Sequence, residues 1–142
     1  MVNNTNKILV TGGSGMVGKA LQKIMPDAIY MSSSDCNLEN YDDTLEYLNE
    51  LKIDTIIHIA GKVGGILENL KYPVDFLEKN IYINTNLCKA AHLVGVKNLI
   101  AVLSTCIYPE HANSYPMKEH QLYDGPPPIQ NFSYAYAKRC MA

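Results

Sequence analysis

The stretch Thr11-Gly12-Gly13-Ser14-Gly15-Met16-Val17-Gly18 decides the fold of this 142-residue chain. It follows a short apolar run, Lys7–Thr11, typical of a buried strand, and it leads into an amphipathic stretch that predicts a helix over Gly15–Met25. The glycines satisfy Gly-x-Gly-x-x-Gly from Gly13 and Gly-x-x-Gly-x-x-Gly from Gly12. Glycine permits a tight turn and a close approach of the backbone to a pyrophosphate, whose charge the N-terminus of the next helix favours. The stretch therefore predicts that residues 12–18 bind a dinucleotide.

Strands and helices alternate along the rest of the chain. Apolar runs predict strands over Ala28–Met31, Thr55–Ile59 and Asn98–Leu103, and leucines spaced by three predict a helix over Tyr41–Leu51. A long helix is expected from Pro73 to Val94, capped by Gly95, with one stripe formed by Phe76, Asn80, Ile83, Leu87, Ala91 and Val94. This alternation predicts an α/β fold: a Rossmann-like, doubly wound parallel sheet of about four strands, in one domain over residues 1–142. The fourth strand is expected to form an open edge.

Two segments fall outside this alternation. Residues 108–131 contain five prolines and predict a long loop. From Phe132 the sequence is again helical, and the chain is expected to end inside that helix. A glycine-rich loop is expected over Ala60–Gly65.

Composition and charge exclude several classes of protein. The net charge is -2, with 12 basic and 14 acidic residues and no basic stripe, which argues against a nucleic-acid partner. The apolar stretch after the polar residues Met1–Lys7 is too short for the core of a signal peptide, so none is expected, and no apolar run approaches the ~20 residues that span a bilayer. The four cysteines lack Cys-x-x-Cys spacing, so no metal is expected, and reduced thiols indicate a cytoplasmic protein. The four histidines are interpreted as structural or surface residues.

The end of the second predicted strand bears on the choice of cofactor. An acid at this position holds the ribose 2′-hydroxyl of NAD, whereas a basic or hydroxyl-rich turn accepts the 2′-phosphate of NADP. Here Ser32-Ser33-Ser34 precedes Asp35, which favours NADP(H). Ser33, Asp35, Asn37 and Leu38 are expected to border the adenine end, although an ordinary polar turn would show the same pattern.

Three side chains suggest proton transfer to a ketone. Tyr134 and Lys138 lie four apart on a predicted helix and share one face, so the ammonium is expected to lower the tyrosine pKa and make the phenol a general acid. Ser104 follows the fourth strand at its carboxyl end, where ligands bind in doubly wound sheets. Its hydroxyl can orient a carbonyl, and the cofactor is expected to touch Val102, Leu103, Ser104, Thr105 and Lys138.

The order of these motifs resembles the extended short-chain dehydrogenase/reductases over the whole chain. Besides the glycine turn and Tyr134–Lys138, the matching segments are Lys62–Ile66, Tyr72–Phe76 with Asn80, and Ser104-Thr105-Cys106-Ile107-Tyr108-Pro109. The Val-Gly-Gly and Cys-Ile-Tyr-Pro segments are similar to the branch that epimerises and reduces a GDP-linked 4-keto-6-deoxy sugar with NADPH.

The resemblance implies a role for each matching residue. Tyr134 would be the proton donor, Lys138 would hold the nicotinamide ribose, Ser104 would orient the sugar carbonyl, and Cys106 would be the acid or base of epimerisation. The family implies a homodimer built on the helices near Pro73–Val94 and Tyr134–Lys138. Ser14 and Ser34 stand where some members have arginines for the 2′-phosphate. Family enzymes continue well past residue 142, with a substrate domain and a histidine that pairs with the cysteine.

Several interpretations stay open from the sequence. The chain can be the cofactor-binding part of such an enzyme, expected by itself to bind NADPH weakly and not to turn over. It can be a non-catalytic nucleotide-binding or interaction module. It can also belong to a reductase or epimerase that acts on another nucleotide-sugar ketone.

Overall fold

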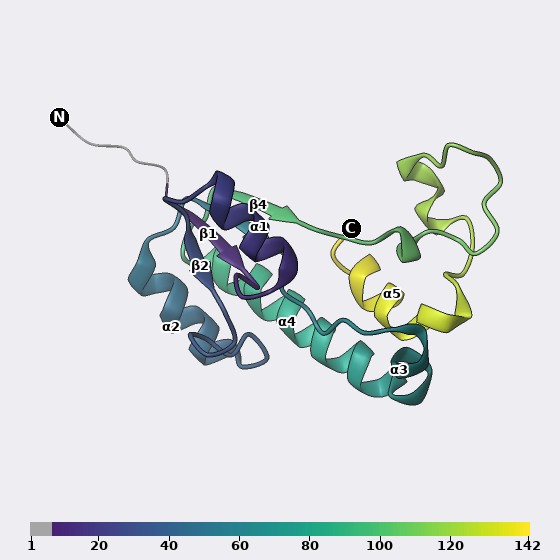
Figure 1. Cartoon of the computed structure of the whole chain (residues 1–142), viewed down its shortest axis with the longest axis horizontal. Coiled ribbons are helices and arrows are strands. Elements are labelled where there is room, and N and C mark those ends of the chain that lie inside the picture. Colours follow the sequence, from purple (N-terminus) through teal and green to yellow (C-terminus); the bar gives the residue numbers. More distant parts are fainter. Residues whose placement is uncertain (1–6) are drawn as a thin grey trace. The chain divides into compact units, whose positions relative to one another are not determined.

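A computed structural model describes residues 7–142, so the N-terminal stretch considered above lies almost wholly outside the described residues. The chain divides into two compact units. Unit 1 comprises Met1–Gly61 and Tyr82–Val102, and unit 2 comprises Lys62–Ile81 and Leu103–Ala142. Figure 1 labels the elements of both units.

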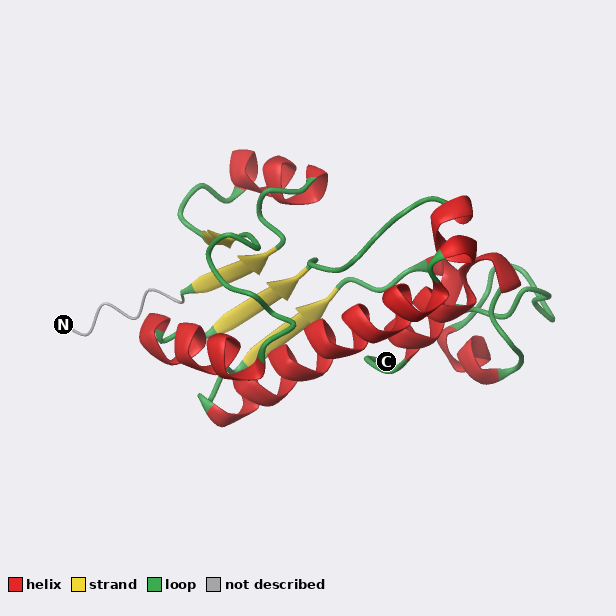
Figure 2. Cartoon of the chain, turned by 90° about the horizontal axis from the view of Figure 1, so that it is seen from below, coloured by secondary structure: helices red, strands yellow, loops and turns green. Residues whose placement is uncertain are grey.

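Unit 1 is built on a parallel sheet. Within residues 7–142 the sheet has four strands in the order β2-β1-β3-β4, with β1 at Ile8–Thr11, β2 at Ile29–Met31, β3 at Thr55–His58 and β4 at Asn98–Ala101. Leu9 pairs with Ile29 on one side and with Ile56 on the other. Figure 2 shows the strand arrows running in the same direction. The predicted α/β fold with a parallel, Rossmann-like sheet is confirmed.

Helices α2 (Tyr41–Leu51) and α4 (Pro73–Leu93) supply the core that covers one face of this sheet. The buried cluster consists of Leu9, Met31, Cys36, Leu38, Leu48, Ile53, Ile56, Ile83, Leu87, Ala90 and Ala91. The predicted stripe of α4 is therefore correct. Its members Ile83, Leu87, Ala91 and Val94 are buried in this core or packed against it. Phe76 and Asn80 are buried within unit 2. Gly95 has a φ of +78°, the left-handed conformation that ends a helix.

Helix α1 (Met16–Ile24) differs from its expected packing. An amphipathic helix is expected to bury its apolar face, which here carries Val17, Leu21 and Ile24, but Ile24 is 73% exposed and Val17 is also exposed. Only Gly18 of this helix is buried. Helix α1 is thus held mainly through its first turn, against the glycine stretch.

Strand β4 is an edge strand, as expected. Its register pairs Ile57 with Ile100 of β4, and no second partner strand exists in the described part of the chain. The apolar sequence nevertheless lies open to solvent, with Leu99 38% and Ile100 55% exposed. Val102 and Leu103, predicted to continue the strand, follow it instead.

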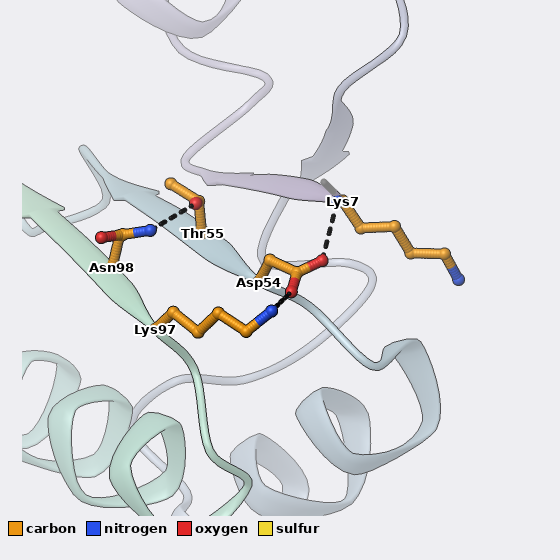
Figure 3. A network of polar contacts seen from close by, with 5 residues as sticks. All are labelled: Lys7, Asp54, Thr55, Lys97 and Asn98. Atoms are coloured by element: carbon orange, nitrogen blue, oxygen red, sulfur yellow. Dashed lines mark hydrogen bonds and ion pairs between the residues drawn. The ribbon is translucent and has the colours of Figure 1, made fainter. Parts of the chain in front are cut away.

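A polar cluster joins the amino ends of β1, β3 and β4 in unit 1 (Figure 3). The Asp54 carboxylate accepts hydrogen bonds from Lys97 Nζ at 2.6 Å and from the Lys7 backbone N–H at 3.2 Å. Asn98 Nδ2 donates to Thr55 Oγ1 at 3.3 Å. The bonds from Lys97 and Lys7 lower the pKa of Asp54.

Asp54→Asn should lower the urea midpoint of unfolding slightly at pH 7, because the pair is exposed and exposed pairs contribute little. The pKa of Asp54 is lower in the folded chain, so its contribution is present above the ordinary value of 3.8 and is lost as pH falls through the folded pKa. The difference between Asp54→Asn and the parent should therefore shrink in urea titrations towards acid pH. A difference that grew on acidification would contradict this assignment.

Unit 2 contains α3 (Ile66–Lys71), the first half of α4, three 3-10 helices and α5 (Phe132–Arg139). The 3-10 helices are η1 (Thr105–Ile107), η2 (Glu119–Tyr123) and η3 (Ile129–Asn131). Helix α3 was not predicted, and η2 and η3 lie in the segment predicted as a loop. The expectation that the chain ends inside a helix is wrong: α5 ends at Arg139, and Ala142 N–H closes a turn on the Arg139 carbonyl.

Candidate functional site

The glycine turn between β1 and α1 has the geometry that its sequence predicts. Gly12 has a φ of +73°, and a Cβ on it would lie 3.0 Å from the Ala60 backbone. A Cβ on Gly18 would lie 2.5 Å from the Gly13 carbonyl oxygen and 2.6 Å from that of Gly12. Gly15 is the N-cap of α1, and no side chain caps this helix. The turn therefore leaves backbone N–H groups at an exposed helix N-terminus, where Ser14, Met16 and Val17 are also exposed.

A buried chain of hydrogen bonds supports this turn. Thr11 Oγ1 lies 2.7 Å from His58 Nδ1, and His58 Nε2 lies 3.2 Å from Asn84 Oδ1 of α4. Because the Asn84 oxygen can only accept, Nε2 carries the hydrogen and Nδ1 accepts from the Thr11 hydroxyl. The Thr11 oxygen is then available to accept from Ala60 N–H at 3.1 Å. His58 is thus a structural residue, as predicted, and the other three histidines are exposed.

Thr11→Val should destabilise the fold by about 1–3 kcal/mol, because it keeps the shape but leaves His58 Nδ1 and Ala60 N–H without the buried hydroxyl. Urea unfolding at neutral pH measures the loss. Thr55→Val, one strand away, removes a hydroxyl that accepts a more exposed bond from Asn98 and serves as the matched control. Equal effects of the two substitutions would contradict a special role for the buried chain.

The turn after β2 is more acidic than the NADP prediction assumed. Asp35 Oδ2 accepts from the Ser32 hydroxyl at 2.6 Å and from the Ser32 N–H at 2.8 Å, which lowers the pKa of Asp35. A hollow of about 470 Å³ beside it is lined by Ser33, Ser34, Asp35, Cys36, Asn37, Asp43, Glu46, Tyr47 and Glu50. The side chain of Leu38, a residue expected at the adenine end, is buried in the core. Ser33, Ser34, Asp35 and Asn37 are exposed here.

Unit 2 brings three of the predicted catalytic residues together. Ser104 Oγ accepts a hydrogen bond from the backbone N–H of Cys106 at 3.2 Å, and the Ser104 side chain is near enough to Tyr134 to act on its pKa. Cys106 also acts on the pKa of Tyr134, so the three residues lie in one part of unit 2. Ser104 thus lies between a thiol in η1 and a phenol in α5. Thr105 begins η1 and is exposed.

The pKa of Tyr134 is raised, contrary to the sequence expectation. Burial is the main cause, the nearby Cys106 charge adds to it, and the Ser104 hydrogen bond opposes it. Lys138 is only 2% exposed, and desolvation lowers its own pKa. The phenol therefore holds its proton at neutral pH.

Sequence reasoning missed two residues that shape this site. Asn131 Nδ2 donates to Cys106 Sγ at 3.4 Å, and its position three residues before Tyr134 was the available signal. The Arg139 guanidinium donates to the carbonyls of Ile107 and Gly125, so it ties η1 and the proline-rich segment to α5. The burial of Arg139 could not be predicted from the sequence, because a cationic residue in the last turn of a helix is usually exposed.

The segment Lys62–Gly65 is held by two asparagines of unit 2. Asn80 is fully buried, accepts from Lys62 N–H at 2.9 Å and donates to the Lys62 carbonyl at 3.0 Å. Asn69 donates to the carbonyls of Gly64 and Gly65. The Asn69 side-chain oxygen is buried and makes no hydrogen bond.

Residues 7–142 contain no helix that is both long and apolar enough to cross a membrane. No group of three or more His, Cys, Asp or Glu side chains is arranged to hold a metal ion in this part of the chain. All four cysteines are free.

Comparison with known proteins agrees with this geometry. Residues 8–142 match the NAD dependent epimerase/dehydratase family, and the chain belongs to this family. It is similar to the GDP-L-fucose synthase of Dictyostelium discoideum, with 40% identity over 98% of this chain and 46% of the relative. The chain thus spans less than half the length of this relative.

Two solved structures extend the comparison. A GDP-L-fucose synthetase from Naegleria fowleri bound to NADP has a TM-score of 0.87 and 34% identity, covering 99% of this chain and 47% of that one. A GDP-D-glycero-L-gluco-heptose synthase from Campylobacter jejuni, in the presence of NADPH, has a TM-score of 0.89 and 26% identity. It covers 96% of this chain and 41% of that one.

Proposed function

We propose that this chain binds NADPH and supplies the proton-transferring groups of an enzyme that converts GDP-4-keto-6-deoxy-D-mannose to GDP-L-fucose. The observation that carries the proposal is the cluster of Ser104, Cys106 and Tyr134 in unit 2. A thiol beside a phenol suits a reaction with two chemistries, proton exchange next to a ketone and reduction of that ketone. The similarity to the Dictyostelium and Naegleria proteins supports this substrate.

The residues of unit 1 fit a dinucleotide. A side chain at Gly18 would collide with the turn, and one at Gly12 would crowd the Ala60 backbone. The uncapped N-terminus of α1 leaves N–H donors for a pyrophosphate. Bound NADPH would supply the hydride. The serines after β2 support the phosphorylated cofactor, and the carboxylates lining the neighbouring hollow oppose it.

Each residue of the cluster has a distinct task in this proposal. Tyr134 keeps its proton at neutral pH because its pKa is raised, so it can donate to the ketone oxygen. The Ser104 hydroxyl orients that oxygen. The Cys106 thiolate removes a proton from the carbon beside the ketone: an S–H bond forms, the C–H bond breaks, and its electron pair moves onto the ketone oxygen. A second acid on the opposite face, the role that the family resemblance gives to a histidine, then donates a proton to that face, inverts the carbon and restores the ketone, and the thiol releases the proton that it took.

Product analysis tests the proposal. The chain is joined to the part of the Dictyostelium relative that follows the matched region, and the chimera receives NADPH and GDP-4-keto-6-deoxy-D-mannose. Formation of GDP-L-fucose supports the proposal. A folded chimera that binds NADPH without turnover would favour a non-catalytic nucleotide-binding module instead.

Cofactor choice is tested on the 142-residue chain itself. Calorimetric titrations with NADPH and NADH should show tighter binding of NADPH if the serines after β2 accept the 2′-phosphate. Equal or tighter binding of NADH would overturn the NADP assignment and give the determining role to the carboxylates beside Asp35.

A second substrate class is favoured by the similarity to the Campylobacter jejuni heptose synthase. In this alternative the same cluster acts on a different GDP-linked keto sugar. A GDP-heptose ketone offered to the chimera distinguishes the two, because the alternative predicts its reduction in preference to the 6-deoxy sugar.

Assembly as a homodimer is part of the proposal. Val74 and Tyr82 of α4 are exposed apolar residues, and so is Tyr136 of α5. Light scattering after gel filtration measures the mass, and a monomer at high concentration would argue against the dimer. A cytoplasmic location fits free thiols and a reduced cofactor.

A further inference from the structure

Asn131 occupies a helix-capping position without capping the helix. It directly precedes Phe132, the first residue of α5, and asparagine is among the best N-cap residues. No side-chain capping hydrogen bond is present there. Instead, Asn131 Nδ2 donates to Cys106 Sγ at 3.4 Å. The Asn131 side chain therefore binds the Cys106 sulfur and does not cap the helix.

The burial, contacts and charged neighbours of Cys106 indicate what this hydrogen bond does. The thiol is half-buried, so it stays accessible to small molecules. Its backbone N–H is fixed by Ser104 Oγ, which sets the direction of the side chain. Helix α5 packs against η1 and carries the ionisable residues Tyr134, Tyr136, Lys138 and Arg139, whereas η3 carries none.

We propose that Asn131 is a positioning residue that orients the Cys106 sulfur and stabilises its thiolate by donating an amide N–H. The inference rests on the proposed function, in which this thiolate exchanges the proton beside the ketone. A donor of fixed geometry keeps the sulfur ionised without placing a second charge beside Tyr134. An amide N–H also cannot take the substrate proton itself, so the thiol remains the exchanging group.

The test measures thiolate formation directly and uses neither cofactor nor sugar. Iodoacetamide alkylates the thiolate, forming an S–C bond as iodide leaves, and mass spectrometry of the Cys106 peptide gives the rate against pH in the 142-residue chain. Asn131→Ala should move the midpoint of this profile up by about 0.5–1 pH unit, because a hydrogen bond to a charged group is lost. Alkylation below the midpoint should therefore slow by about three- to tenfold.

Asn131→Asp separates this role from helix capping. Aspartate is as good an N-cap as asparagine and carries a favourable charge for a helix start, so a capping role predicts a folded, unchanged protein. The proposal predicts a larger upward shift than Asn131→Ala, because a carboxylate replaces the donor. Gln130→Ala, one residue earlier in η3, is the control and should leave the profile unchanged.

Four outcomes decide between the proposal and its alternatives. Upward shifts in both Asn131 variants support the proposal, and unchanged midpoints in both overturn it. If Asn131→Ala unfolds, which labelling of the buried Cys36 would reveal, the profile of Asn131→Asp decides alone. Shifted profiles in a chain whose chimera makes no GDP-L-fucose would overturn the proposed function and leave the Asn131–Cys106 pairing standing.

Discussion

Tyr134→Phe should lower the rate of ketone reduction in the chimera by about 10²–10⁴-fold, the usual contribution of a general acid. The substitution removes one oxygen from a half-buried ring and leaves the packing of α5 in place. The raised pKa of Tyr134 means that the parent phenol carries its proton at neutral pH. Consumption of NADPH followed by absorbance measures the rate, and NADPH affinity should stay unchanged.

Tyr136→Phe is the matched control for this experiment. Tyr136 lies two residues further along α5, is exposed, and stacks against Phe132 with ring centroids 4.6 Å apart. Its substitution should leave the rate within about twofold, because no proton transfer is assigned to it. Similar losses in the two variants, or retention of a tenth of the activity by Tyr134→Phe, would remove Tyr134 from the proposed mechanism.

Gly18→Ala should weaken NADPH binding by roughly 5- to 150-fold, which corresponds to about 1–3 kcal/mol of overpacking. The added methyl would lie 2.5 Å from the Gly13 carbonyl oxygen, so the turn or α1 must shift. Helix propensity works in the opposite direction, since alanine is better than glycine inside a helix by about 1 kcal/mol. The sign of the effect therefore reports whether the close approach governs this position.

Calorimetric titration of NADPH into the folded variant measures this loss, with thermal unfolding followed in parallel. Gly125→Ala is the control, because a Cβ there would make an ordinary contact of 3.4 Å with Pro109. Tighter binding or a higher melting temperature in Gly18→Ala would show that the turn can open and would contradict the geometric argument.

The order of strands and helices in unit 1 could be predicted, because it depends on patterns among residues that are close in the sequence. The period of the α4 stripe and the apolar runs of β1 and β3 report burial directly, because a packed face must repeat at the period of its helix or strand. Exposure of Ile100 could not be predicted in the same way. An apolar strand has the same sequence whether or not another element covers it.

The sequence predicted which residues form the proposed site but not all of their contacts or the direction of the Tyr134 pKa. Ser104, Cys106 and Tyr134 were found from motifs, and the structure brings them together in unit 2. The direction of the Tyr134 pKa was wrong, because spacing along a helix says nothing about how deeply the lysine is buried. The burial of the Leu38 side chain was not predicted, because it depends on contacts with residues that are distant in the sequence. The bond from Asn131 to Cys106 joins residues 25 positions apart, so the position of Asn131 near Tyr134 could suggest a role in the site but could not identify its partner.

The Arg139 guanidinium links three segments of unit 2 through hydrogen bonds. It donates to two carbonyl groups, one at Ile107 next to Cys106 and one at Gly125 in the proline-rich segment. A guanidinium stays charged throughout the working pH range and amide carbonyls do not ionise, so this linkage does not loosen with acidity. Substitutions around Gly125 therefore offer a way to tune the reactivity of the sulfur from a distance, leaving every reacting atom in place.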